Sequence, residues 1–448
     1  MASSARGVRI VLVGAGSASF GVGTLADILT VGKDCLEGAT VVLHDLDDRA
    51  LRVVGAALER VRPAWLTVEA TSEPRRALEG ARFVIVSIEN GNRAETWKQD
   101  YYVPLRHGSR QVYGENGGAG GAFHTWRQMG PLLSLARAME SSCPGALLLN
   151  YSNPLPRLGL ALSKASRVST VGLCHGIGAA LKALERILGT GVSGLEYTSA
   201  GLNHFYWLVK VKAKEDFAMP ALGSHPGRSV RAGEDLLPDI RSRGYEWAVS
   251  EELHFVAELL RLYGHLCYPS QSHPAEYVAW ADAYCPSVKY DFNAMVHRAE
   301  NLRSRLEAAG EGRDDADWWV HPSGERAVHI IREVLLDAGE HEDAVNVVNG
   351  SVIPNLPADC VVEVPARVDG RGVHPDPVGP LPSPIARLLS KEVIVQQAVV
   401  EAGLSGDYDA AVRALLLDET VPTPGIARAI LDEMIELQGE LLPPFRRR

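Results

Sequence analysis

The stretch Val8–Phe20, VRIVLVGAGSASF, decides the fold of the first part of the chain. Its beginning, Val8–Val13, is an apolar run with β-branched residues in which only Arg9 is charged, and such a run is typical of a strand buried on both faces of a parallel sheet. Gly14 and Gly16 follow, and an apolar pattern with helical spacing begins at Phe20. A buried strand, a glycine turn and a helix in this order predict a nucleotide-binding α/β unit.

The glycine turn and the end of the next strand predict which dinucleotide binds. Gly16 lets the backbone approach a pyrophosphate at the helix N-terminus, where N–H groups face an anion. Asp45 follows a second strand, Thr40–His44, and a carboxylate there accepts both ribose hydroxyls of adenosine but repels a 2′-phosphate. We therefore predict NAD; since Ser19 replaces a third glycine, a tight turn in a non-binding sheet is the alternative. The expected cofactor contacts are Gly14, Gly16, Ser17, Ser19, Phe20, Asp45, Asn90 and Asn150.

The order of the remaining elements predicts an α/β protein. Further apolar runs predict strands that alternate with helices, so residues 1–195 are expected to form an NAD-binding, doubly wound, Rossmann-like parallel sheet. The alternation fades afterwards, and residues 196–448 are expected to form a mixed α+β domain for substrate binding and oligomerisation. Within it, Tyr245–Tyr263 reads as one helix. The further predicted strands are Arg82–Ile88, Ala146–Tyr151, Thr170–Leu173, Glu196–Gly201, Phe205–Lys212 and Asp359–Val364.

Composition excludes several classes of protein. The 448 residues carry a net charge of −10, which argues against a broad nucleic-acid surface. No apolar run approaches the roughly 18 residues of a membrane span, and the short polar N-terminus lacks the features of a signal peptide. Six cysteines without a CxxC pair are expected to be free thiols. The cytoplasm is therefore the predicted compartment.

Polar side chains gather at the predicted strand ends, where open α/β sheets bind ligands. Asn150 and Asn153 follow one strand, and an amide that both donates and accepts suits a sugar hydroxyl. Cys174 ends another strand, and His204 lies 30 residues further on; together they suit a divalent ion with open positions. A buried inert thiol and a structural histidine are the alternatives. The segment Gly114–Gly121 holds too much glycine to pack in a core and is expected to approach a ligand.

Taken together, these segments resemble glycoside hydrolase family 4, the NAD- and metal-dependent glycosidases, over nearly the whole chain. The resemblance rests on VLVGAGSASF (Val11–Phe20), HDLDDRAL (His44–Leu51), the GGAGG segment with Trp126-Arg127, NYSNP (Asn150–Pro154), VGLCHG (Val171–Gly176), AGLNH (Ala200–His204), HPAEY (His273–Tyr277) and VNVVNGSVIPNLPADCVVEVPA (Val345–Ala366).

The resemblance implies a glycosidase that oxidises the sugar at C3, eliminates the C1 substituent after loss of the C2 proton, adds water and re-reduces C3. It implies Cys174 and His204 as ligands of a divalent metal, manganese, and a homodimer or homotetramer. Asn153 matches the family's sugar-binding residue. The stretch that holds the family's Tyr or Asp base has no Asp here, so Tyr268 is expected to be the base, ahead of Tyr263 and His273.

The chain departs from the family where the loop reads GENGGAGG and His124 replaces an Arg. We therefore expect a hexoside with an anionic C6 group, a sulfoquinovoside or a uronide. The alternative activity is an NAD-dependent sugar or 2-hydroxy-acid dehydrogenase with net NADH production. The expected substrate contacts are Asn153, His175, Asn203, Arg93, His124, Trp126, Arg127, Gln128 and His273.

Overall fold

The computed structural model describes residues 5–17, 20–285 and 291–447. Its first half contains a six-stranded parallel region. Ile10, Val11 and Leu12 on β1 are fully buried, as the apolar run predicts. The strands are β1 (Arg9–Val13), β2 (Thr40–His44), β3 (Thr67–Thr71), β4 (Phe83–Val86), β5 (Leu147–Asn150) and β6 (Ser169–Gly172), in the order β3-β2-β1-β4-β5-β6. The predicted fold class is confirmed. The sequence missed only β3 of these six, because its side chains are largely exposed or half-buried.

Side chains that alternate along the strands fill two cores, one on each face of this sheet. Ile10 and Leu12 pack into one core with the helices α1 (Phe20–Thr30), α2 (Asp48–Val61) and α11 (Ala327–Leu336). Val11 and Val13 pack into the other. The second core is formed with α5 (Gly118–Ser142), α6 (Leu155–Ala165), α12 (Ser383–Ser405), α13 (Tyr408–Leu417) and α14 (Pro424–Gln438). Helices far apart in the chain therefore cover the same sheet.

The sheet continues from the first half into the second. β11 (Glu340–Val348) pairs antiparallel with β6 at Asn346 and Gly172, and with β12 (Val361–Asp369). β12 in turn pairs with β7 (Leu195–Leu202) and with the short β13 (Gly372–Pro375), and β7 pairs with β8 (Phe205–Ala213). α10 (Phe292–Gly310) also returns to pack on α2. The division at residue 195 stays a prediction, because one mixed sheet spans both sides of it.

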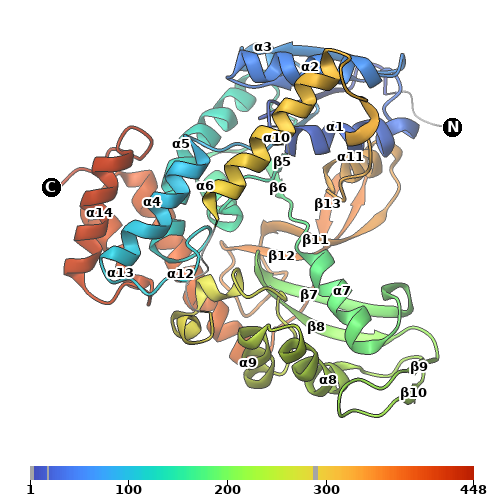
Figure 1. The fold of residues 1–448 in the computed structure, drawn as a ribbon, viewed down its shortest axis with the longest axis vertical. Helices are drawn as coiled ribbons and strands as arrows, with labels where there is room; N and C mark the ends of the chain where they lie inside the picture. Colours follow the sequence, from blue (N-terminus) through green and yellow to red (C-terminus); the bar gives the residue numbers. More distant parts are fainter. Residues whose placement is uncertain (1–4, 18–19, 286–290, 448) are drawn as a thin grey trace.

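Elements formed by residues 177–263 lie next to β7 and β8 (Figure 1). The helix predicted over Tyr245–Tyr263 is wrong: α8 (Leu237–Ser250) and α9 (His254–Tyr263) are separate, and Glu252 between them has a left-handed φ of 60°. A hairpin of β9 (Phe217–Met219) and β10 (Arg228–Val230) precedes them. Within the described ranges, no helix is both long and apolar enough to cross a membrane. The other helices are α3 (Pro74–Leu78), α4 (Arg93–Arg106) and α7 (Ile177–Leu188).

The glycine segment 114–121 is buried, so the prediction that it cannot pack in a core is wrong. α5 begins within it, at Gly118. A Cβ on Gly120 would lie 2.5 Å from the Asp100 carbonyl oxygen, and a Cβ on Gly121 would lie 2.5 Å from the Asn116 carbonyl carbon. The glycines are needed here because backbone packs directly on backbone.

Candidate active site

The glycine turn after β1 is held by the predicted acid. The Gly16 N–H donates to Oδ2 of Asp45 over 2.9 Å, and the Asp47 N–H donates to Oδ1 over 3.0 Å. Gly14 has a φ of +86°, and a Cβ there would overlap the Ser87 carbonyl oxygen. The turn and the carboxylate thus lie together at the carboxyl edge of β1 and β2, where a dinucleotide would meet both.

The other expected cofactor contacts lie around this turn, except that Ser19 falls outside the described residues. The Ser17 hydroxyl accepts the Phe20 N–H over 3.2 Å, and the Phe20 ring packs 4.5 Å from the Tyr151 ring. Asn150 is buried, and its Oδ1 accepts the Ser152 N–H over 3.0 Å. Asn90 donates through Nδ2 to the Arg127 carbonyl over 3.0 Å. Both asparagines fix the loops that follow β4 and β5.

Cys174 and His204 lie side by side, as a shared metal ion requires. Sγ of Cys174 is 3.4 Å from Nε2 of His204, which follows β7 with a left-handed φ of 62°. Burial, followed by the charge of the Glu363 carboxylate, raises the pKa of the Cys174 thiol to about 12. Burial, with His273 and His175 nearby, holds the pKa of His204 well below its usual value. A thiol that ionises only beside a cation and a neutral imidazole fit a divalent metal.

The rings of His273 and Tyr268 both stack on the His204 ring. The His204 ring stacks on the His273 ring at 4.3 Å and on the Tyr268 ring at 5.8 Å between centroids. Burial, followed by the charges of Cys174 and Glu363, raises the pKa of the Tyr268 phenol. Tyr263 packs instead on Trp207, at 5.2 Å. Tyr268 and His273 therefore border the Cys174–His204 pair, and Tyr263 belongs to the core of the second half.

Glu363 is a buried acid near the Cys174–His204 pair that was not predicted from the sequence. Glu363 on β12 accepts Nδ2 of Asn203 over 2.6 Å and Nδ2 of Asn346 over 3.0 Å. Burial raises the pKa of Glu363 to about 7, against the opposing effect of both amides. Asn203, expected to bind substrate, thus anchors the turn that carries His204. The available signal was a glutamate inside the apolar run 360–366, where an acid needs buried partners.

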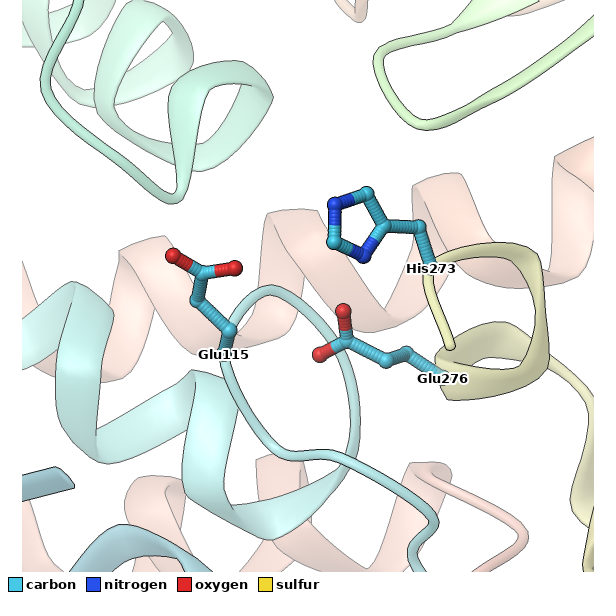
Figure 2. Close-up of side chains that lie close together, drawn as sticks. All are labelled: Glu115, His273 and Glu276. Carbon is cyan, nitrogen blue, oxygen red and sulfur yellow. The ribbon is translucent and has the colours of Figure 1, made fainter. Parts of the chain in front are cut away.

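Figure 2 shows a second group, formed by Glu115, His273 and Glu276, in which one ligand atom from each side chain lies within 4.8 Å of the others. Glu276 is 2% exposed, and its Oε2 accepts the N–H groups of Asn116 over 2.6 Å and Gly117 over 2.9 Å. Burial, followed by the charge of Glu115, raises the pKa of Glu276 to about 8. Neither glutamate was singled out in the sequence, although both stand in motifs that were.

The basic residues expected at the substrate pair with acids. Arg127 is buried and donates to both Asp100 oxygens, over 3.0 and 2.7 Å. A guanidinium nitrogen of Arg93 lies 3.6 Å from Glu115. Nε2 of His124 lies 3.4 Å from Glu89, which also accepts a hydrogen bond from the Gln128 amide. These groups surround a small pocket lined by Glu89, Arg93, Trp97, Asp100, Glu115, His124 and Arg127.

The remaining expected substrate contacts occupy different surroundings. Asn153 is half-buried after β5. The His175 side chain is 75% exposed beside Cys174, and its Nδ1 lies 3.0 Å from Glu325. Trp126 is 1% exposed in the core on α5, and its indole N–H donates to the Val399 carbonyl over 2.8 Å. A side chain so enclosed cannot contact a sugar, so the expected Trp126 contact is wrong, whereas the contacts of Asn153 and His175 stay predictions.

Comparison with known proteins identifies the family of this chain. A model described as "Family 4 glycosyl hydrolase" matches residues 9–190, and one described as "Family 4 glycosyl hydrolase C-terminal domain" matches residues 199–421. The chain belongs to glycosyl hydrolase family 4. The predicted family and the predicted class of enzyme, a glycosidase, are confirmed.

Relatives of this family 4 chain differ in their described activities. It is 33% identical to an "Alpha-glucosidase" of Erwinia rhapontici over 96% of the chain and 98% of the relative. It is 30% identical to an "Alpha-galactosidase" of Rhizobium meliloti, over 98% of the chain and 89% of the relative. A solved 6-phospho-alpha-glucosidase from gut microorganisms, in complex with NAD and Mn2+, superimposes with a TM-score of 0.83 at 21% identity, over 98% of the chain and 100% of the relative.

Proposed function

We propose that this chain is an NAD-dependent α-glycosidase that cleaves a neutral hexoside by oxidation at C3, elimination across C1 and C2, addition of water and re-reduction. The observation that carries the proposal is the Cys174–His204 pair beside Tyr268, in the same mixed sheet as the Gly16–Asp45 turn. A two-carboxylate glycosidase needs neither a nucleotide turn nor a thiol–imidazole pair.

Two groups are expected to bind to the residues described above. NAD, held at Gly14, Gly16 and Asp45, would supply the oxidant for sugar C3 and return the electrons at the end of the cycle. A divalent ion, manganese by likeness to the solved relative, would be held by Cys174 and His204 and would stabilise negative charge on the sugar oxygens. The thiol–imidazole donor set, with Sγ of Cys174 3.4 Å from Nε2 of His204, supports this assignment.

The residues of the chain have separate tasks in the proposed reaction. Tyr268 is assigned as the base that takes the C2 proton, since its ring stacks beside His204 and borders Cys174. Burial raises the pKa of this phenol, so the phenolate would need a positive charge nearby to form at neutral pH. Asn153 and the exposed His175 are assigned to sugar hydroxyls. Glu363 keeps Asn203, and through it the His204 turn, in place.

The ion pairs around the small pocket favour a neutral C6 group over the anionic group expected from the sequence. Arg127 donates two hydrogen bonds to Asp100, and Arg93 and His124 each face a glutamate. A sulfonate or carboxylate placed there would meet three carboxylates as well as the basic groups. The α-glucosidase and α-galactosidase relatives also support a neutral α-hexoside. A sulfoquinovoside or uronide is the alternative, and relatives described as "Alpha-galacturonidase", 25–28% identical, keep the uronide in the test.

A panel of nitrophenyl glycosides tests both the reaction and the substrate. Neutral α-glucoside and α-galactoside, with 6-phosphorylated, sulfonated and uronic analogues, are assayed with and without NAD and manganese. We expect nitrophenol release from a neutral α-hexoside only with NAD, little net NADH, and solvent deuterium at sugar C2. Stoichiometric NADH without nitrophenol would instead identify the dehydrogenase alternative, and preference for a charged analogue would overturn the neutral C6 assignment. Assembly as a homodimer or homotetramer stays a prediction.

A further inference from the structure

Two segments that are distant in sequence meet beside the Cys174–His204 pair through one carboxyl group. Glu276 lies in the short 3-10 helix Pro274–Tyr277, three residues after His273. Its Oε2 accepts the N–H groups of Asn116 and Gly117, 160 and 159 residues away in sequence. These two N–H groups belong to the residues that lead directly into α5. The carboxyl therefore fixes the backbone in front of the helix, whereas the Gly120 N–H in the first helical turn donates to Oε1 of Gln111 over 2.9 Å.

The backbone of Gly117 packs so closely on Glu276 that position 117 has no space for a side chain. Gly117 lies so near the Glu276 backbone that a Cβ on it would stand 2.5 Å from the Glu276 carbonyl oxygen and 2.8 Å from its Cβ. A methyl group at Gly117 would push the two segments apart. The residue that precedes these N–H groups is Glu115, whose carboxylate faces His273 and Glu276 (Figure 2).

We propose that Glu276 is a positioning residue of the glycosidase: it holds the segment 115–118 against the segment 273–277 and so sets where the Glu115 carboxylate and the His273 ring stand beside His204. His273 stacks directly on His204, at 4.3 Å between centroids, and Glu115 lies close enough to influence the pKa of both His273 and Tyr268. The inference rests on the proposed function, because it assigns Glu276 to that same site.

The role depends on an acceptor oxygen, which predicts an ordered series of variants. Glu276→Gln keeps a carbonyl oxygen for the two N–H groups, whereas Glu276→Ala removes the acceptor and Gly117→Ala forces the segments apart. We expect Glu276→Ala and Gly117→Ala each to lower kcat by about tenfold or more, since small displacements of reacting groups carry large rate losses. Glu276→Gln should retain kcat within about threefold. KM should change less than kcat in all three, because the sugar contacts Asn153 and His175 are untouched.

The experiment uses the full chain with NAD and manganese, and follows kcat, KM and the Kd of NAD measured by calorimetry. The Kd of NAD should stay within about twofold in every variant, because Glu276 contacts Asn116 and Gly117 and not the Gly16–Asp45 turn. Glu333→Gln is the matched control: Glu333, on α11, is also a buried glutamate whose pKa is raised to about 8, but its neighbours are Arg326, just before that helix, and Glu342 on β11. This control should keep full kcat.

Two results would overturn the inference. One is Glu276→Ala with unchanged kcat; the other is Glu276→Gln as impaired as Glu276→Ala. Should Glu276→Ala fail to fold, Gly117→Ala decides alone, and full activity in that variant removes the positioning role. An inactive wild-type chain that nevertheless binds NAD would refute the proposed function and is thereby distinguished from failure of this inference.

Discussion

Oδ2 of Asp45 accepts the Gly16 N–H over 2.9 Å, so the acid after β2 and the turn after β1 already form one unit. Asp45→Ala should raise the Kd of NAD by about 10- to 100-fold, because the ribose loses a charged acceptor and the turn loses its anchor. Calorimetric titration with NAD measures this. Asp47→Ala is the control: Asp47 caps α2, so its loss should lower stability but not NAD affinity. Equal affinity in wild type and Asp45→Ala would remove the cofactor site from this turn.

We expect the thiol of Cys174 to bind the metal ion together with His204. Cys174→Ser replaces a soft sulfur by a hard, neutral hydroxyl, so the Kd for manganese should rise by at least about tenfold and metal-stimulated nitrophenol release should be lost. Manganese titration followed by electron paramagnetic resonance reports the binding directly. Cys143→Ser, at the end of α5, is the control and should bind manganese as the wild type does. A wild type as active with chelator as without it contradicts the metal assignment.

The phenol of Tyr268 is the assigned base. Tyr268→Phe keeps the ring that stacks on His204 but removes the proton acceptor, so kcat and deuterium exchange at sugar C2 should both fall by about 100-fold or more. Tyr263→Phe should retain both rates, since Tyr263 packs on Trp207 in the core. Deuterium incorporation is followed by NMR of the product. Loss of exchange in Tyr263→Phe but not in Tyr268→Phe would move the role to Tyr263.

The acid pair between α11 and β11 should make stability fall at alkaline pH. Burial, followed by the charge of Glu342, raises the pKa of Glu333 to about 8, above its unfolded value. The folded state therefore binds this proton more tightly, and its stabilising effect is lost as pH rises from the unfolded toward the folded pKa. The free energy of unfolding should drop by about 1–2 kcal/mol from pH 6 to pH 9. Urea unfolding measures it, and Glu333→Gln should show a smaller drop; an equal drop would exclude Glu333 as the cause.

Features that depend on residues close together in the sequence could be predicted from it, whereas contacts between distant segments could not. The apolar run Val8–Val13 and its glycine turn predicted β1 and its neighbours, since burial on both faces requires such composition. The contact of Glu276 with Asn116 leaves no spacing pattern, because 160 residues separate the partners. Trp126 stands next to Arg127 in a motif of the family, yet its ring points into the core between α5 and α12. A motif identifies neighbours in sequence but does not say which side chain faces the ligand.

The same distinction explains the predictions that the structure overturned. The apolar spacing of Tyr245–Tyr263 continues across a break at Glu252, which only the left-handed backbone there reveals. The glycines of 114–121 indicated close approach correctly, but the partner is the protein's own backbone at Asp100, Asn116 and Glu276. Likewise, the arginines read as receptors for an anion could not be seen to have their own acids until the fold brought Asp100 and Glu115 to them.

The junction of β6 with β11 has a consequence for how the protein is made. The parallel strands of residues 9–172 find their next neighbour only at residues 340–348, and three of the helices that build the core on one face together with α5 and α6 come later still, from residues 383–438. The strands up to β6 therefore leave the ribosome long before α12, α13 and α14 are made. Until then the sheet has an open edge and part of the apolar surface of α5 and α6 is uncovered, so the nascent chain is most exposed to aggregation or chaperone capture during the second half of its own translation.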